Sequence, residues 1–288
     1  MTAGNPTIGD LRDEGIRRLQ PMAVAGSAAT PELDAEVLLA HVLSVPRAYL
    51  RSHPEASAGQ RAGEYHALLE RRARGEPLAY LTGTREFWSL PLAVTPAVLV
   101  PRPETELLVE RALALRGEPH GRVADLGTGC GAVALALASE RPRWQVTATE
   151  VSAQALEVAR ANAARLGQVG IDFRLGSWFA PLLAERFDLI VSNPPYVAAC
   201  DPALSDPALA HEPRLALTPG ADALACLRII ARDAPQHLAP GGWLVLEHGA
   251  EQGGPVRHQL VLAGFRYVRS HHDPAGHERV TEGQYGPL

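Results

Sequence analysis

Residues 123–138 read VADLGTGCGAVALALA, an apolar strand-like run that passes through Gly127, Gly129 and Gly131 directly into a helix-like run. Glycines let the backbone pass close to a ligand, and a helix N-terminus offers free N–H groups and a positive dipole end to an anionic group. The stretch therefore predicts a nucleotide-type cofactor site at the junction of a strand and a helix.

The class of nucleotide stays open at this stage, because Gly127, Gly129 and Ala132 also satisfy the dinucleotide pattern G-x-G-x-x-G/A. Glu150 ends the next strand-like run, WQVTATE, about twenty residues after the glycines, where either cofactor class needs an acid for the ribose hydroxyls. The alternative interpretation of Glu150 is an exposed acid that caps a helix over residues 152–166. Next to a glycine loop, the ribose role is the better prediction.

A second motif, NPPY at residues 193–196, follows the apolar run FDLIV and a serine. In a doubly wound fold, ligands collect at the carboxyl ends of the strands, so the motif is predicted to face the cofactor. Each proline lacks an N–H, which keeps the carbonyl of Pro194 out of a local turn, and Asn193 adds a side-chain carbonyl beside it. Two fixed acceptors suit both hydrogens of a planar –NH2 group, and Tyr196 supplies a flat wall. A solvent-exposed polyproline turn is the alternative.

The chemistry indicated by this motif also selects the cofactor. A nitrogen conjugated to a carbonyl or an aromatic ring is a poor nucleophile, so it needs a strong electrophile such as the methyl sulfonium of S-adenosylmethionine. The nitrogen becomes strongly acidic once methylated and needs no dedicated base, so catalysis rests on orientation and on stabilisation of the growing charge. The sequence therefore predicts methyl transfer from S-adenosylmethionine to a planar amino group.

The rest of the chain supplies the elements around these motifs. From Glu104 onward, helical and strand patterns alternate, which predicts a mostly parallel sheet covered on both faces. The predicted strands are 122–126, 145–150, 171–176, 187–192, 242–247, 265–271 and 279–285, and the predicted helices are 104–116, 131–140, 152–166, 221–237 and 255–263. Earlier residues show helical spacing at 8–20, 31–43 and 58–74 and a β-hairpin pattern at 85–96. We predict an N-terminal helical domain (1–80), a hairpin linker (81–103) and a catalytic domain (104–288).

Composition sets the limits of this interpretation. The 288 residues are 46% hydrophobic, enough for a sizeable core, and no stretch reaches the roughly 20 continuous apolar residues of a membrane span. The N-terminus MTAGNPTIGD lacks the pattern of a secretory signal, and the three cysteines lack the spacing of a zinc site or disulfide framework. We therefore expect a cytoplasmic protein without a structural metal. A net charge of −5 argues against broad, sequence-independent binding to nucleic acid.

Further motifs are ARGEPLAYLTG (73–83), VLVPRPETELLVE (98–110), HEPRLAL (211–217), LEHG (246–249) and ERVTEGQY (278–285). Together with DLGTGCG and VSNPPY they resemble the bacterial PrmC (HemK) family, the methyltransferases that modify peptide chain release factors on a glutamine side-chain nitrogen. The resemblance implies a Rossmann-like, class I S-adenosylmethionine-dependent methyltransferase domain with a seven-stranded, mostly parallel sheet. It implies that the substrate is the glutamine (N5) of the Gly-Gly-Gln motif in class I release factors, and that the helical domain helps to dock this protein partner.

The resemblance also assigns roles to residues. The methionine part of the cofactor would be lined by Gly127, Thr128, Gly129, Cys130 and Gly131. Glu150 would hold the ribose, and Trp178 would flank the adenine. The family usually has Asp at the position of Glu150 and commonly has Asp before Trp178, where this chain has Ser177. Glutamate keeps the carboxylate but reaches one methylene further, and any contact of Ser177 with the adenine amine would be a neutral one.

On the substrate side, the resemblance places Asn193 against both the cofactor and the target amide. Pro194, Pro195 and Tyr196 would complete the substrate pocket, and the predicted catalytic residues are Asn193, Pro194 and Tyr196. NPPY alone is shared with adenine-N6 methyltransferases of DNA and RNA, which remain the alternative function, whereas RPETE and GEPLAY are more specific to the PrmC family.

Two other patterns receive plain structural interpretations. His271, His272, Asp273 and His277 could be drawn as a metal cluster, but they lie in a polar segment between the last two predicted strands, which favours a solvated turn. A non-catalytic protein that kept the fold is disfavoured by the presence of an intact NPPY motif beside an intact glycine loop.

Overall fold

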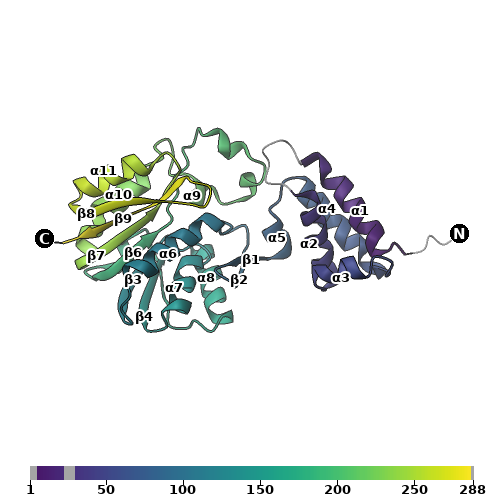
Figure 1. Ribbon diagram of the computed structural model, residues 1–288, viewed down its shortest axis with the longest axis horizontal. Coiled ribbons are helices and arrows are strands. Elements are labelled where there is room, and N and C mark those ends of the chain that lie inside the picture. Colours follow the sequence, from purple (N-terminus) through teal and green to yellow (C-terminus); the bar gives the residue numbers. More distant parts are fainter. Residues whose placement is uncertain (1–4, 23–29, 287–288) are drawn as a thin grey trace. The chain divides into compact units, whose positions relative to one another are not determined.

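The computed structural model of the chain describes residues 5–22 and 30–286. Two compact units make up the structure, and each is described by itself. The first contains Met1–Gly83 and the short segment Pro207–His211, and the second contains Thr84–Asp206 and Glu212–Leu288 (Figure 1). The residues of the predicted hairpin therefore fold with the second unit.

The first unit is helical, with the elements α1 (Ile8–Leu19), α2 (Pro31–Leu43), α3 (Arg47–Ser52), α4 (Ala62–Ala73) and α5 (Leu78–Thr82). Thr7 caps α1, because its hydroxyl accepts a hydrogen bond from the backbone N–H of Asp10 at 3.1 Å. The fully buried Tyr65 donates to the carbonyl of Ala35 at 3.2 Å, which ties α4 to α2 through the core. The predicted helices 8–20 and 31–43 are confirmed, whereas 58–74 begins late because residues 59–61 form a 3-10 turn.

The second unit is built on a seven-stranded sheet, which confirms the predicted fold class. Its strands are β3 (Gly121–Leu126), β4 (Trp144–Glu150), β5 (Asp172–Leu175), β6 (Phe187–Ser192), β7 (Leu238–Glu247), β8 (Phe265–His272) and β9 (Glu278–Tyr285). Their order in the sheet is β5-β4-β3-β6-β7-β9-β8. All neighbouring pairs from β5 to β7 are parallel, and β9 runs antiparallel to both β7 and β8. The chain steps out from β3 to β5 and then returns to the other side of β3 with β6, which creates a topological switch point between β3 and β6.

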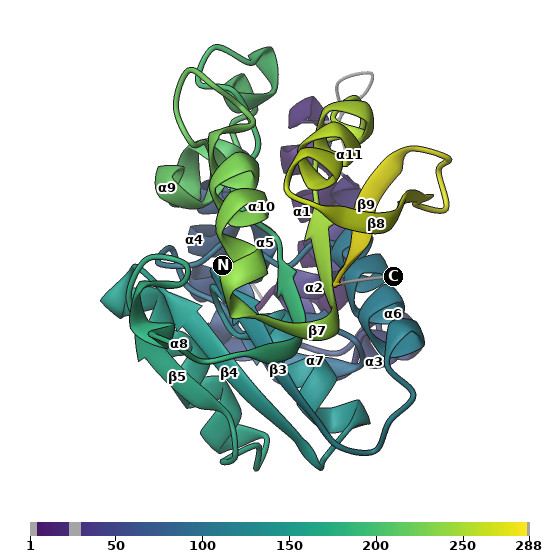
Figure 2. The same ribbon diagram turned by 90° about the vertical axis from the view of Figure 1, so that its left-hand side faces the viewer.

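Helices cover both faces of the sheet (Figure 2). They are α6 (Glu106–Leu115), α7 (Ala132–Glu140), α8 (Ala153–Arg165), α10 (Ala225–His237) and α11 (Gly253–Leu262). One face, including Leu126, Ile190 and Leu244, packs against α10 and α11 around Ile230 and Leu260, all of which are fully or almost fully buried. Side chains along a strand point alternately to the two faces of the sheet, and Leu126, Ile190 and Leu244 all point to this one.

Several element boundaries differ from the sequence prediction. The hairpin consists of β1 (Thr84–Phe87) and β2 (Leu90–Ala93), with Trp88 and Ser89 at positive φ in the turn, so the predicted turn around residues 89–91 was wrong. Non-glycine residues rarely adopt positive φ, and nothing local indicates it here. Strand β7 starts four residues earlier than predicted because a register irregularity lets Leu238 pair with Phe187. Helix α10 starts at Ala225, because Asp222 accepts from the N–H of Leu224 in a preceding turn. Within the described residues, no helix is both long and apolar enough to cross a membrane.

Candidate active site

The register of the sheet brings the two sequence motifs together. In the parallel pair β3–β6, Leu126 lies opposite Ser192, so the glycine loop and NPPY leave neighbouring strands at the same level. The buried hydroxyl of Ser192 donates to the carbonyl of Leu126 at 2.7 Å and locks this register. Both motifs therefore emerge at the switch point, where open α/β sheets bind ligands.

The glycine loop has a backbone that other residues would not readily adopt. Gly127, Gly129 and Gly131 all have positive φ, at 74°, 57° and 87°. Asp125, near the end of β3, holds the loop through hydrogen bonds. One of its carboxyl oxygens accepts from the Thr128 hydroxyl at 2.7 Å and from the Ala134 N–H at 3.2 Å. Burial raises the pKa of Asp125 to about 6, although both hydrogen bonds lower it. Asp125 thus anchors the loop to the start of α7.

Glu150, at the end of β4, is 92% buried beside this loop, since only 8% of it is exposed. Its Oε2 accepts from the N–H of Gly129 and its Oε1 accepts from the N–H of Ser152, both at 3.0 Å. The cap of α8 is Ser152, whose hydroxyl accepts from the N–H of Ala155 at 3.2 Å. The interpretation of Glu150 as an exposed helix cap was therefore wrong. The Glu150 carboxylate thus bridges the glycine loop and the start of α8.

A cavity of about 590 Å³ opens at this end of the sheet. Among the residues predicted for the site, those that line it are Gly127, Thr128, Gly129, Cys130, Glu150, Trp178, Asn193 and Pro195. Three others are not part of its lining: Gly131 is the N-cap of α7, Pro194 is buried, and Tyr196 is partly buried against the hydrophobic core. The structure thus collects most of the predicted residues around one space.

Trp178 forms one wall of the cavity next to the glycine loop. A Cβ placed on Gly127 would lie 3.1 Å from the Trp178 ring, so a side chain at position 127 would require the ring to shift. Trp178 itself has a φ of 48°, a conformation that costs energy for a bulky residue and that concentrates at functional sites.

Cys130 belongs to the glycine loop, and burial raises the pKa of its thiol to about 12. This cysteine therefore stays protonated and is no nucleophile.

Side-chain hydrogen bonds hold both ends of NPPY. Asn193 Nδ2 donates to the hydroxyl of Thr105 at 3.1 Å, and the Tyr196 hydroxyl donates to Glu247 at 3.0 Å. The carbonyl of Tyr196 accepts from the side chain of Gln252 at 2.9 Å. Burial, followed by the nearby Glu247, raises the pKa of the Tyr196 phenol, so it remains a hydrogen-bond donor.

Two cavity walls come from segments outside the predicted set of site residues. They come from residues 96–105, which carry most of the RPETE motif, and residues 213–219, which carry most of HEPRLAL and the short helix α9 (Arg214–Leu217). Glu212 joins them: its carboxylate accepts from the N–H of Val100 at 3.1 Å and from Arg102 at 2.6 Å. The motifs themselves were visible in the sequence, but their pairing across 112 residues leaves no local signal.

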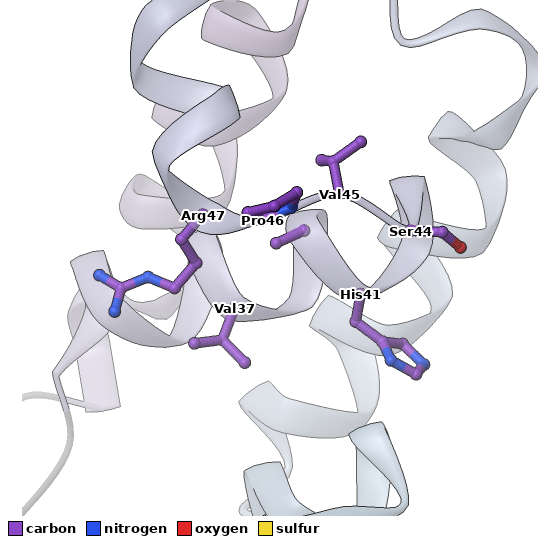
Figure 3. A pocket seen from close by; sticks show the side chains of 7 residues that line it. Val37, His41, Ser44, Val45, Pro46 and Arg47 are labelled. Atoms are coloured by element: carbon purple, nitrogen blue, oxygen red, sulfur yellow. The ribbon is translucent and has the colours of Figure 1, made fainter.

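The remaining candidates do not form a second reaction site. His271 pairs with Glu282 at 3.0 Å, while Asp273 pairs with Arg279 at 3.1 Å, and no group suited to a metal ion occurs in residues 5–22 and 30–286. A shallow hollow on the first unit lies at the turn from α2 to α3 (Figure 3). His41 and Arg47 at its edge point away from each other, so it gathers no reactive set of side chains.

Comparisons with known proteins identify relatives that match most of the chain. The family model "Methyltransferase small domain" matches residues 103–212, and "PrmC N-terminal domain" matches residues 10–83. Proteins named release factor glutamine methyltransferase are similar over most of the chain. The protein from Xylella fastidiosa (strain Temecula1) is 51% identical, covering 92% of this chain and 98% of its own, and that from Escherichia coli is 43% identical, covering 94% and 96%.

Solved structures show the same fold at low sequence identity. A methyltransferase from Pyrococcus furiosus superimposes with a TM-score of 0.53 at 20% identity, covering 76% of this chain and 99% of its own. The hMettl16 catalytic domain in complex with an RNA hairpin gives a TM-score of 0.58 at 16% identity, covering 76% and 83%. At these identities the likeness concerns the architecture alone.

Proposed function

The chain belongs to the release factor glutamine methyltransferase family, and from this we propose that it transfers a methyl group from S-adenosylmethionine to a glutamine side-chain nitrogen (N5). The target is the glutamine of the Gly-Gly-Gln motif in class I peptide chain release factors, and the modification would modulate translation termination. The observation that carries the proposal is the placement of Asn193 and the glycine loop around one cavity at the switch point of the sheet.

The residues around the cavity fit S-adenosylmethionine. The glycine loop allows close approach of the methionine part at the N-terminus of α7, and the Glu150 carboxylate can accept hydrogen bonds from ribose hydroxyls. Trp178 offers a ring face to the adenine, next to Gly127. When bound, the cofactor supplies an electrophilic methyl group on its sulfonium.

The substrate amide requires two acceptors in fixed positions. Asn193 Oδ1 and the Pro194 carbonyl accept the two hydrogens of the –NH2 group, so that the nitrogen lone pair is aimed at the electrophile. The same acceptors stabilise positive charge that grows on the nitrogen as it reacts. Pro195 lines the cavity, and Tyr196, held by Glu247, flanks the substrate.

Recognition of a whole protein requires contacts beyond one amide. We assign this docking role to the helical residues 1–80, with residues 81–103 as the connection to the methyltransferase domain 104–288. The net charge of −5 gives no reason to expect direct binding of nucleic acid. Because release factors act on ribosomes, the proposed reaction places this enzyme in the cytoplasm.

A labelling experiment separates this function from adenine methylation. The protein is incubated with radiolabelled S-adenosylmethionine and, in parallel, with a release factor, its Gly-Gly-Gln glutamine→Ala variant, and duplex DNA. We expect label only in the unmodified release factor. Label in the DNA with none in the release factor would contradict the proposal.

A further inference from the structure

Thr105 occupies the N-cap position of α6, immediately before the helix, but its side chain makes no capping hydrogen bond. Instead its hydroxyl accepts from Asn193 Nδ2, 88 residues away in the sequence, and the residue is only 4% exposed. The threonine thus contributes to the NPPY motif and not to its own helix.

The Thr105 hydroxyl also acts on the carboxyl group of Glu247, at the end of β7, because it lowers the pKa of that carboxyl group. Glu247 is 1% exposed; its Oε1 accepts from Tyr196, and its Oε2 has no hydrogen-bond partner among the described residues. Burial is the main cause that raises the pKa of Glu247 to about 7, and the charge of Glu104 also raises it. The hydroxyls of Thr105 and Tyr196 and the charge of Arg279 lower this pKa. The carboxylate is therefore buried with spare capacity to accept hydrogen bonds.

The direction of these hydrogen bonds follows from the chemistry of the groups. In its ionised form the Glu247 carboxylate accepts hydrogen bonds and donates none, so in that form it draws the single proton of the Thr105 hydroxyl toward itself. The threonine oxygen can then offer Asn193 only lone pairs. An asparagine amide can rotate to exchange its oxygen and its nitrogen, and only the nitrogen end can donate to Thr105. Its oxygen is then left for another donor, and no described residue donates to it.

We propose that Thr105 is a positioning residue for methyl transfer, which fixes the Asn193 amide so that its oxygen is presented to the amino group of the substrate. This inference rests on the proposed function of Asn193 as an acceptor. Without the threonine hydroxyl, the amide can turn its –NH2 end to the substrate, where two donors would oppose each other. The loss would fall on turnover, because orientation matters most in the transition state.

The test compares Thr105→Val, which removes the hydroxyl at nearly constant shape, with Thr105→Ser, which keeps it. We expect kcat to fall at least about tenfold in the valine variant, and to stay within about threefold of the unsubstituted protein in the serine variant. The Kd for S-adenosylmethionine, measured by calorimetry, should change by less than about twofold in both, which also shows that the variants fold.

A double-substitution experiment distinguishes positioning from a general packing role. If Thr105 acts through Asn193, Thr105→Val should lower single-turnover methyl transfer no further in the Asn193→Ala background. A further drop of about tenfold there, equal loss in the valine and serine variants, or a valine variant within threefold of the unsubstituted protein would each overturn the inference. All rates are measured on whichever substrate the unsubstituted protein labels, release factor or DNA, since both present a planar amino group. Label in DNA alone would therefore reject the proposed function without deciding the role of Thr105.

Discussion

Replacing Glu150 should weaken the binding of S-adenosylmethionine while the fold of the glycine loop persists. The carboxylate accepts from Gly129 and Ser152, but the loop is also held by hydrogen bonds from the N–H groups of Gly127 and Thr128 to the carbonyl of Thr149, at 2.8 and 3.0 Å. These backbone bonds do not depend on the residue at position 150. The loss from Glu150→Ala should therefore fall mainly on the ligand.

The magnitude follows from the kind of contact that is removed. A carboxylate that is 92% buried and bonded to ribose hydroxyls makes charge-assisted hydrogen bonds, whose loss costs about 1–3 kcal/mol. The Kd of S-adenosylmethionine should then rise about 5- to 150-fold in the alanine variant. Glu150→Asp keeps the charge but is one methylene shorter, so its Kd should lie between those of the other two proteins.

Isothermal titration calorimetry on the three proteins measures this series, and thermal unfolding without cofactor serves as the control for loop stability. The expected order of affinity is Glu, Asp, Ala. An alanine variant that binds S-adenosylmethionine within twofold of the unsubstituted protein would refute the assigned role of Glu150. Tighter binding of NAD than of S-adenosylmethionine would refute the assignment of the cofactor.

Asn193→Ala should lower kcat about 100-fold or more in steady-state assays while the cofactor Kd changes far less, and a kcat within twofold would remove Asn193 from the mechanism. Glu212→Ala should lower the free energy of unfolding in urea by about 1–3 kcal/mol, because the N–H of Val100 loses its buried acceptor. Arg102→Ala leaves that bond intact and should cost less, so equal losses would count against this explanation. The free energy of unfolding of the Glu247→Gln variant should rise relative to that of the unsubstituted protein as the pH increases from 4.5 to about 7, by up to about 3 kcal/mol. Thermal or urea unfolding at several pH values measures this difference. A difference that does not depend on pH would contradict the prediction.

The sign of the last effect comes from burial. The pKa of Glu247 is raised in the folded protein, so the neutral carboxyl is compatible with folding at low pH. Above about 7 the folded protein must bury a charge that the unfolded chain exposes to water, and the stability present below pH 4.5 is lost. A glutamine at this position stays neutral throughout and does not suffer that loss.

Much of the catalytic unit was predictable because its signals are local. Alternating helical and strand patterns give a parallel sheet, and three glycines between a strand and a helix give a loop with positive φ. Once the strands are placed, the rule that ligands bind at the switch point brings the glycine loop and NPPY together. The pairing of Leu126 with Ser192 confirms that expectation.

The features that escaped prediction depend on contacts between distant residues. The bonds of Asn193 to Thr105 and of Tyr196 to Glu247 join residues 88 and 51 positions apart, and no periodicity encodes such partners. The turn at Trp88 and Ser89 depends on positive φ at residues that rarely adopt it. In both cases tertiary packing selects a conformation that local preference does not indicate.

Tandem mass spectrometry of a release factor, after incubation with this protein and S-adenosylmethionine, identifies the residue that carries the transferred methyl group. The account predicts one methyl group on the side-chain nitrogen of the Gly-Gly-Gln glutamine, present with the unsubstituted protein and strongly reduced with Asn193→Ala. An unmodified glutamine after incubation with protein that binds S-adenosylmethionine, or a methyl group on a different residue, would contradict it.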